Sequence, residues 1–297
     1  QEFVEYMHNQ LLKCEYINAD ETKLEVLELK KSEGRQDCYM WVYKTGRSEE
    51  KKMVLYQFEN DRKYDRGSDY LEGFNGVIQS DGYQAYANIK DVKNMGCFAH
   101  LRRKLVEVMD VAPKGTGIKE TQTYKMYQLI NKLFYLEKVY DKKYKKDYDR
   151  ITRERKTKSL PVLEEFYEIV ETVAPHTPKK SHLDTAMTYA INKEKYLKYY
   201  IEDGQVEISN NSAERCCKSF VIGRKNFLFS NSINGAKASG TAYSIIESAK
   251  MNGLKPYEYI EYILTRMTGN KLTTDLLEKI MPWSEELPKN LYKNKKA

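Results

Sequence analysis

The sequence contains no long apolar run. No apolar stretch approaches the roughly 20 residues that a helix needs to cross a bilayer. No charged segment followed by an apolar one opens the chain. We therefore expect neither insertion into a membrane nor secretion, and we expect a cytoplasmic protein.

Cysteine is also scarce. The chain has 5 cysteines, an odd number, and none of them lies in a Cys-x-x-Cys pair. This pattern argues against a disulfide framework and against a zinc site built from thiolates. We expect reduced thiols, most of them buried.

What the sequence has in excess is basic charge. The 50 Lys and Arg residues outnumber the 43 Asp and Glu residues, which gives a formal net charge of +7. Because Lys and Arg neutralise phosphates, a nucleic acid is a suitable partner for this charge. Lysine on solvated faces, or a genome of skewed base composition, would produce the same surplus.

Three segments near the start of the chain predict strands: apolar and polar residues alternate in the first, and the other two are strand-like runs. The segments are 14–29, 37–43 and 51–58. The short links between them favour an antiparallel meander.

The following segments alternate between helix and strand patterns. We expect a short helix at 68–74, a buried strand at 76–80, a helix after Gly82, a strand at 95–99 and a basic helix at 101–108. Three strands followed by helix, strand, helix and strand is the order of a ribonuclease H-like α/β fold with a mixed sheet.

The length of 297 residues exceeds that of most single domains. Helical periodicities fill 112–203 and predict a large helical insertion in the ribonuclease H-like catalytic domain. The first part of that domain is then 1–111, its completion is 204–268, and 269–297 is a C-terminal tail. Within the insertion, the charged segment 140–158 fits a DNA-facing surface or a solvated helix face, and we favour the solvated face.

Three acidic residues have ordinary explanations when each is taken alone. The segment 206–230 begins with a predicted short strand and continues into a helix, where Asn211 and Glu214 have the spacing of a capping box. Glu214 can also pair with Lys218 one turn later. Asp81, followed by glycine, fits a hairpin turn, and Asp20 fits a turn at the end of a strand.

Together the three acids indicate a metal site. Asp20 falls within the first strand, Asp81 at the end of the fourth and Glu214 at the start of a helix, and these places converge in a ribonuclease H-like sheet. An acid buried in mid-strand needs a partner or a cation to offset its desolvation. Carboxylates suit Mg²⁺ or Mn²⁺, and two such ions about 3.5–4 Å apart would support phosphodiester chemistry.

Several blocks of sequence carry a family resemblance. They are NADET (18–22), IQSDGYQAY (78–86), GCFAHLRRKL (96–105), SHLDTAMTYAIN (181–192), SNNSAER (209–215) and IGRKNFLFSNSINGAKAS (222–239), running into IIESAKMNGLKPYEYI (245–260). In this order they resemble the transposases of insertion sequence sixty-six, within the class that uses an Asp-Asp-Glu metal triad. The resemblance implies that Asp20, Asp81 and Glu214 form the triad, with the helical insertion between Asp81 and Glu214.

The chain departs from the family pattern at two positions. Ser209 stands where family members usually have Asp, and Lys218 stands where Arg is usual. The family also has an amino-terminal region for DNA-end recognition, which is not visible before Gln1. We therefore expect a catalytic-core fragment or the product of a truncated gene.

Basic residues near the acids are candidates for DNA binding, because phosphate contacts position a substrate. Arg224, Lys225 and Asn226 would hold a backbone. Phe227 and Phe229 would then stack a displaced base, although both also fit a core strand.

A second set of candidates is His100, Arg102, Arg103, Asn211 and Arg215. His100 fits a contact with the scissile phosphate or a capping role, and Arg102, Arg103 and Lys104 fit phosphate contacts or a solvated surface. Cys97 and His100 alone are too few for a metal site, so we favour a structural role for Cys97.

The function implied is a DNA transposase that cleaves element ends and transfers the freed strand into target DNA. Because two ends must meet, we expect a homo-oligomer on nucleoid DNA, possible element-encoded accessory proteins, and no membrane partner. A nuclease of the same fold that lacks strand transfer, and a decayed remnant that only binds DNA, are the alternatives.

Overall fold

The computed structural model describes residues 1–34, 37–63, 65–82, 84–87, 89, 91–113, 115 and 117–293. The chain forms two units: unit 1 comprises Gln1–Ile78, Gln84–Lys93 and Ser212–Ala297, and unit 2 comprises Gln79–Tyr83 and Asn94–Asn211. The boundary between the units therefore falls within two strands of the sheet and at the start of one helix.

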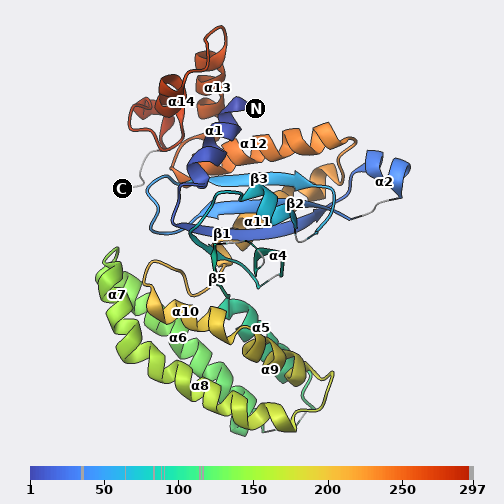
Figure 1. The fold of residues 1–297 in the computed structure, drawn as a ribbon, viewed down its shortest axis with the longest axis vertical. Helices are drawn as coiled ribbons and strands as arrows, with labels where there is room; N and C mark the ends of the chain where they lie inside the picture. Colours follow the sequence, from blue (N-terminus) through green and yellow to red (C-terminus); the bar gives the residue numbers. More distant parts are fainter. Residues whose placement is uncertain are drawn as a thin grey trace. The chain divides into compact units, whose positions relative to one another are not determined.

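Five strands form one mixed sheet in the order β3-β2-β1-β4-β5 (Figure 1). They are β1 (Tyr16–Leu24), β2 (Cys38–Thr45), β3 (Val54–Glu59), β4 (Val77–Gln79) and β5 (Lys93–Met95). The pairs β1–β2 and β2–β3 are antiparallel, which confirms the predicted meander. The strand predicted at 95–99 is wrong beyond Met95, because Phe98 begins a helix.

The helices of unit 1 are α1 (Glu2–Leu11), α2 (Leu27–Glu33), α3 (Asp65–Tyr70), α4 (Gln84–Ala87), α11 (Asn211–Phe227), α12 (Ile233–Met251), α13 (Pro256–Met267) and α14 (Thr274–Ile280). The short helix predicted at 68–74 thus lies earlier, because residues 71–73 form a turn.

Strand β2 is apolar on both faces because both faces are covered. Side chains alternate along a strand, so Met40 and Val42 point to one face and Trp41 and Tyr43 to the other. The first pair joins an apolar cluster with α11 and α12. On the other face, Trp41 meets the ring of Tyr86 edge to face, with centroids 5.5 Å apart.

The edge strand β3 is closed by α12, which runs along it (Figure 1). The backbone N–H groups of Val54 and Tyr56 donate to the hydroxyls of Ser248 and Ser244 at 2.9 and 2.8 Å. Gly240 lies one turn earlier, and a Cβ there would be only 2.6 Å from the Tyr56 carbonyl oxygen. Small residues at every fourth position therefore let the helix approach the strand backbone.

Unit 2 is helical over most of its described length. Its helices are α5 (Phe98–Asp110), α6 (Gln122–Tyr144), α7 (Tyr148–Glu154), α8 (Leu160–Val173), α9 (His182–Asn192) and α10 (Glu194–Glu202), with a π-helical turn at Arg155–Ser159 between α7 and α8.

Unit 2 contains a buried ion pair. Arg155 is fully buried and pairs with Glu137, its Nη2 lying 2.6 Å from Oε2. Its guanidinium also donates to the carbonyls of Tyr200, Asp203 and Val206 at 2.8, 2.6 and 2.9 Å. The solvated-face interpretation of 140–158 is therefore wrong at Arg155, which faces the interior.

The strand predicted at the start of 206–230 is also wrong, because residues 206–209 adopt no strand. Their backbone groups have other partners: the Val206 carbonyl accepts from Arg155, and the Ile208 carbonyl accepts the N–H of Phe98 at 3.2 Å. Hydrogen bonds to a side chain and to the start of a helix thus replace the backbone hydrogen bonds that a strand would form in a sheet.

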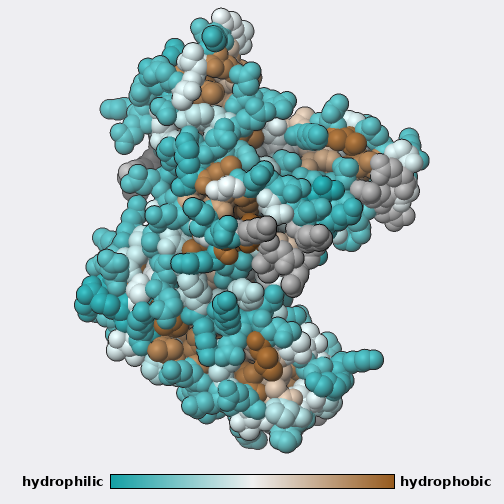
Figure 2. Space-filling model, viewed as in Figure 1, coloured by the Kyte–Doolittle hydropathy of each residue, from teal (hydrophilic) through white to brown (hydrophobic). Residues whose placement is uncertain are grey.

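Within the described residues, every helix is too short or too polar to cross a bilayer. Hydrophilic residues cover most of the face drawn in Figure 2.

Loss of both serine hydroxyls should destabilise the closed edge. The Ser244→Ala/Ser248→Ala variant leaves two backbone N–H groups of β3 without acceptors, and each is expected to cost about 1–3 kcal/mol of unfolding free energy. Urea unfolding followed by circular dichroism measures the loss. The control is Ser239→Ala, whose exposed hydroxyl bonds within its own helix. If the two variants were equally stable, the Ser244 and Ser248 hydroxyls would not stabilise the edge of β3.

Candidate active site

Asp20 lies on the face of β1 that α11 covers. It is in register with Val42, which belongs to the apolar cluster beneath α11. The Asp20 carboxylate accepts the backbone N–H of Glu21 at 2.9 Å and the thiol of Cys217 from α11. Burial, followed by the charge of Asp20, raises the pKa of the Cys217 thiol well above its ordinary value, so the thiol stays protonated and donates.

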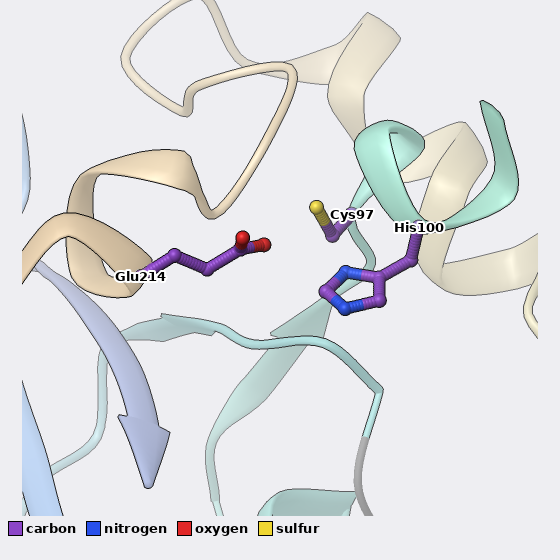
Figure 3. Close-up of side chains that lie close together, drawn as sticks. All are labelled: Cys97, His100 and Glu214. Atoms are coloured by element: carbon purple, nitrogen blue, oxygen red, sulfur yellow. The ribbon is translucent and has the colours of Figure 1, made fainter. Parts of the chain in front are cut away.

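Glu214 lies on the same helix as Cys217. Helix α11 begins at Asn211, so Glu214 is in its first turn, where the helix dipole favours a carboxylate. Figure 3 shows the Glu214 side chain leaving this turn. Because residues at i and i+3 are neighbours on a helix surface, unit 1 brings Asp20 to the part of α11 that carries Glu214.

Asp81 lies just beyond the end of β4, the strand beside β1 in the sheet. Its carbonyl accepts the Tyr189 hydroxyl at 3.0 Å within unit 2. Gly82 has a φ of +97°, and a Cβ there would meet Lys193 Cε at 3.0 Å, so a lysine side chain lies beside this turn. The hairpin interpretation is wrong, because the turn leads to α4 and not to a strand.

Glu21, the neighbour of Asp20 in NADET, has a side chain that is only 3 % exposed. It faces away from α11, forms an ion pair with Arg62 and accepts the Tyr86 hydroxyl at 2.8 Å. Burial, followed by the Glu21 charge, raises the pKa of Tyr86 well above its ordinary value. The partner needed by an acid in mid-strand is therefore a protein cation in the case of Glu21.

Cys97 and His100 lie at the start of α5 (Figure 3). Cys97 is buried, and its sulfur accepts the Asn210 N–H at 3.2 Å, which supports the structural role favoured from the sequence. Ser209, the departure from the family pattern, is buried as well. The α5 N-cap is Cys97, so His100 does not occupy the cap position.

The basic residues of α5 differ in their surroundings. Arg102 lies over the Phe134 ring, 4.4 Å from its centroid, and donates to Asn131 at 3.5 Å. Lys104 lies over Tyr189 at 5.5 Å. Arg103 is exposed, so among these three it presents its side chain most openly to solvent.

Further DNA-binding candidates on α11 are Arg215 near its start and Arg224, Lys225 and Asn226 in its last turn. Arg215, Lys225 and Asn226 are exposed, and the half-buried Arg224 donates to the Lys23 carbonyl. Phe227 ends α11. The core-strand interpretation of the two phenylalanines is wrong, because they are 37 and 38 % exposed.

The candidates divide between the two units. Unit 1 holds Asp20, Glu214, Arg215, Arg224, Lys225 and Asn226, and unit 2 holds Asp81, His100, Arg102, Arg103 and Asn211. The sequence patterns single out neither Cys217 nor Lys193. Their only signal is position, since one follows Glu214 by three residues and the other directly follows the SHLDTAMTYAIN block.

Comparisons with known proteins give consistent matches. The family model described as Transposase IS66 family matches residues 1–238, and the one described as IS66 C-terminal element matches 244–283. The chain is 28% identical over 298 residues to the uncharacterized protein y4qI of Sinorhizobium fredii, covering 96% of this chain and 53% of that protein. It is 28% identical over 240 residues to the uncharacterized protein y4jD of the same organism, covering 78% and 45%.

The chain thus spans about half the length of the curated relatives it matches. No solved structure matches it.

Loss of the Glu21 carboxylate should weaken the fold. Glu21→Ala removes the partner of Arg62 and of the buried Tyr86 hydroxyl, and the unfolding free energy should fall by about 2–4 kcal/mol. The matched control is Lys23→Ala, which breaks an exposed pair with Asp37 and should cost under about 1 kcal/mol. Thermal and urea unfolding compare the two, and a Glu21 variant as stable as the control would refute a structural role.

Proposed function

This chain belongs to the IS66 transposase family, and from that premise we propose that it is the catalytic part of a DNA transposase. The proposed activity is cleavage of DNA at the ends of a mobile element and joining of those ends to target DNA. The observation that carries it is the family match over residues 1–238. The contact between Asp20 and the helix that bears Glu214 supports it.

Asp20, Asp81 and Glu214 are proposed to hold divalent metal ions. Their carboxylates are hard oxygen donors, which suit Mg²⁺ or Mn²⁺. Asp20 is only half-buried, and the Glu21 N–H and the Cys217 thiol both donate to its carboxylate. The order of the strands, with β4 beside β1, supports a ribonuclease H-like arrangement in which Asp81 joins the other two acids.

The proposed reaction has two displacements at phosphorus. Two metal ions bound by the acids would activate the attacking oxygen and stabilise the leaving oxygen. In the first displacement, water forms a bond to phosphorus and a DNA 3′-oxygen leaves as a hydroxyl. In the second, that hydroxyl forms a bond to a target phosphate, and a target 3′-hydroxyl leaves. No bond to the enzyme is formed.

The basic side chains would position the DNA. Arg103, Arg215, Lys225 and Asn226 are exposed and fit contacts with phosphates, and His100, Asn211 and Arg224 are proposed to bind nearby. Arg102, which packs on Phe134, would act through its remaining donors. Two element ends must be held together, so a homo-oligomer on nucleoid DNA is part of the proposal, and accessory proteins of the element fit it too.

A decayed copy that only binds DNA is the second candidate, and Ser209 favours it. Strand-transfer assays with pre-cut ends separate the functions. Joined products support the transposase, hydrolysis alone indicates a nuclease, and binding without either reaction indicates a remnant.

Loss of Asp81 should abolish cleavage and leave the fold intact. Asp81→Ala removes a proposed metal ligand, so Mn²⁺-dependent cleavage of an element end should fall by at least about 10²-fold. Asp110→Ala, at the exposed end of α5, is the control and should cleave normally. Circular dichroism checks folding, and full activity of the Asp81 variant would refute the triad.

Replacement of Ser209 by the acid usual in the family tests the remnant hypothesis. The side chain at this position is buried, so an added carboxylate is costly unless it finds a partner. If the acid supports metal binding, Ser209→Asp should raise Mn²⁺-dependent cleavage about 10-fold, while Ser209→Ala should not. A lower melting temperature with no gain in cleavage would show that the acid has no such role here.

A further inference from the structure

The turn that follows α11 contains a strained leucine. Leu228 has a φ of +62°, in the left-handed region that glycine or asparagine usually occupies after a helix. Its N–H donates to the Arg224 carbonyl at 2.7 Å and closes the helix. Glycine would make the same bond without the steric cost of a Cβ, so helix termination does not explain the leucine.

Burial does not explain the leucine either. Leu228 is 64 % exposed, the largest exposure among the three apolar residues of this turn, which also include Phe227 and Phe229. Most of its apolar surface meets water, so packing recovers little of the strain. Strain that packing does not compensate is typical of functional positions.

The turn is held firmly on its far side. The Ser230 N–H donates to the Glu25 carbonyl at 2.9 Å, and the Ser230 carbonyl accepts the Leu27 N–H at 3.0 Å. On the near side, Phe227 meets Phe220 edge to face, with centroids 5.8 Å apart. The exposed leucine is therefore presented by a fixed backbone.

Charged groups of both signs lie beside the turn. A cavity of about 310 Å³ is lined by Leu228 and Leu24, by Lys23, Lys30 and Arg224, and by the acids Glu25 and Asp37. Lys23 is paired with Asp37 and Lys30 with Glu25, so Arg224 gives the lining its net positive charge. Lys225 is exposed on the last turn of α11. Apolar tips flanked by basic side chains complement a DNA duplex, in which charged phosphates surround apolar base stacks.

We propose that Leu228 is a wedge that inserts into the base stack at a duplex end and separates the terminal base pair, with Phe227 and Phe229 stacking on the freed bases. This role rests on the proposed function, which supplies a reason to open DNA ends. Side chains of this kind unstack base steps in other DNA-binding proteins, and aromatic rings hold unpaired bases.

The test measures base opening without cleavage. A blunt duplex with 2-aminopurine in its last base pair is mixed with the protein in Ca²⁺, and fluorescence reports unstacking. The wild-type chain should raise the fluorescence, whereas Leu228→Gly, which keeps the backbone conformation, should lose most of the rise. Leu228→Met should keep it, and the control Ile222→Ala, at a residue of α11 that is 55 % exposed, should match the wild type.

The outcomes separate the wedge from its alternatives. The melting temperature of Leu228→Gly should be no lower than that of the wild type, because the backbone strain at this position is relieved. If the glycine variant does not fold, Leu228→Asn takes its place in the test. Equal opening by the wild type and Leu228→Gly, or Leu228→Asn in its place, overturns the wedge. A change in self-association alone would mark the turn as a protein contact instead. If opening depends on Leu228 but the same chain never cleaves element ends in Mg²⁺ or Mn²⁺, the wedge stands and the proposed function fails.

Discussion

The ion pair between Arg155 and Glu137 is the interaction on which unit 2 depends. A fully buried guanidinium is tolerated only when its donors are satisfied. Here they bond to Glu137 and to the carbonyls of Tyr200, Asp203 and Val206. An apolar side chain of equal volume would fill the space but would donate to none of these carbonyls. The pair thereby fixes the irregular segment that leads directly into α11 and its first-turn acid.

Two adjacent acids in β1 illustrate how a strand gives neighbours different roles. Because side chains alternate across the sheet, Asp20 faces α11 and Glu21 faces the aromatic cluster with Tyr86. Glu21 has a protein cation, Arg62, as its partner, and this contact joins β1 to the segment after β3. Asp20 accepts the Glu21 N–H and the Cys217 thiol, and it is one of the metal ligands that we propose.

The meander was predictable because β2 and β3 are apolar runs separated by a short link. Local patterns failed where distant partners decide the structure. Phe98 and Ala99 extend an apolar run that fits a strand or a buried helix equally well, and they belong to α5. Residues 206–209 have strand-like apolar spacing, but their carbonyls bond to Arg155 and Phe98. The three acids could be named from motifs, whereas Cys217 as the partner of Asp20 required the packing of α11.

The small residues of α12 have a consequence for how copies of this protein can gather. An unprotected outer strand is a template on which another chain can add its own backbone, and such addition leads to fibrous aggregates. At β3 the template is blocked, because Ser244 and Ser248 occupy the amides that an incoming strand would need. Crowding of many copies along one nucleic acid would then not extend the sheet from this side.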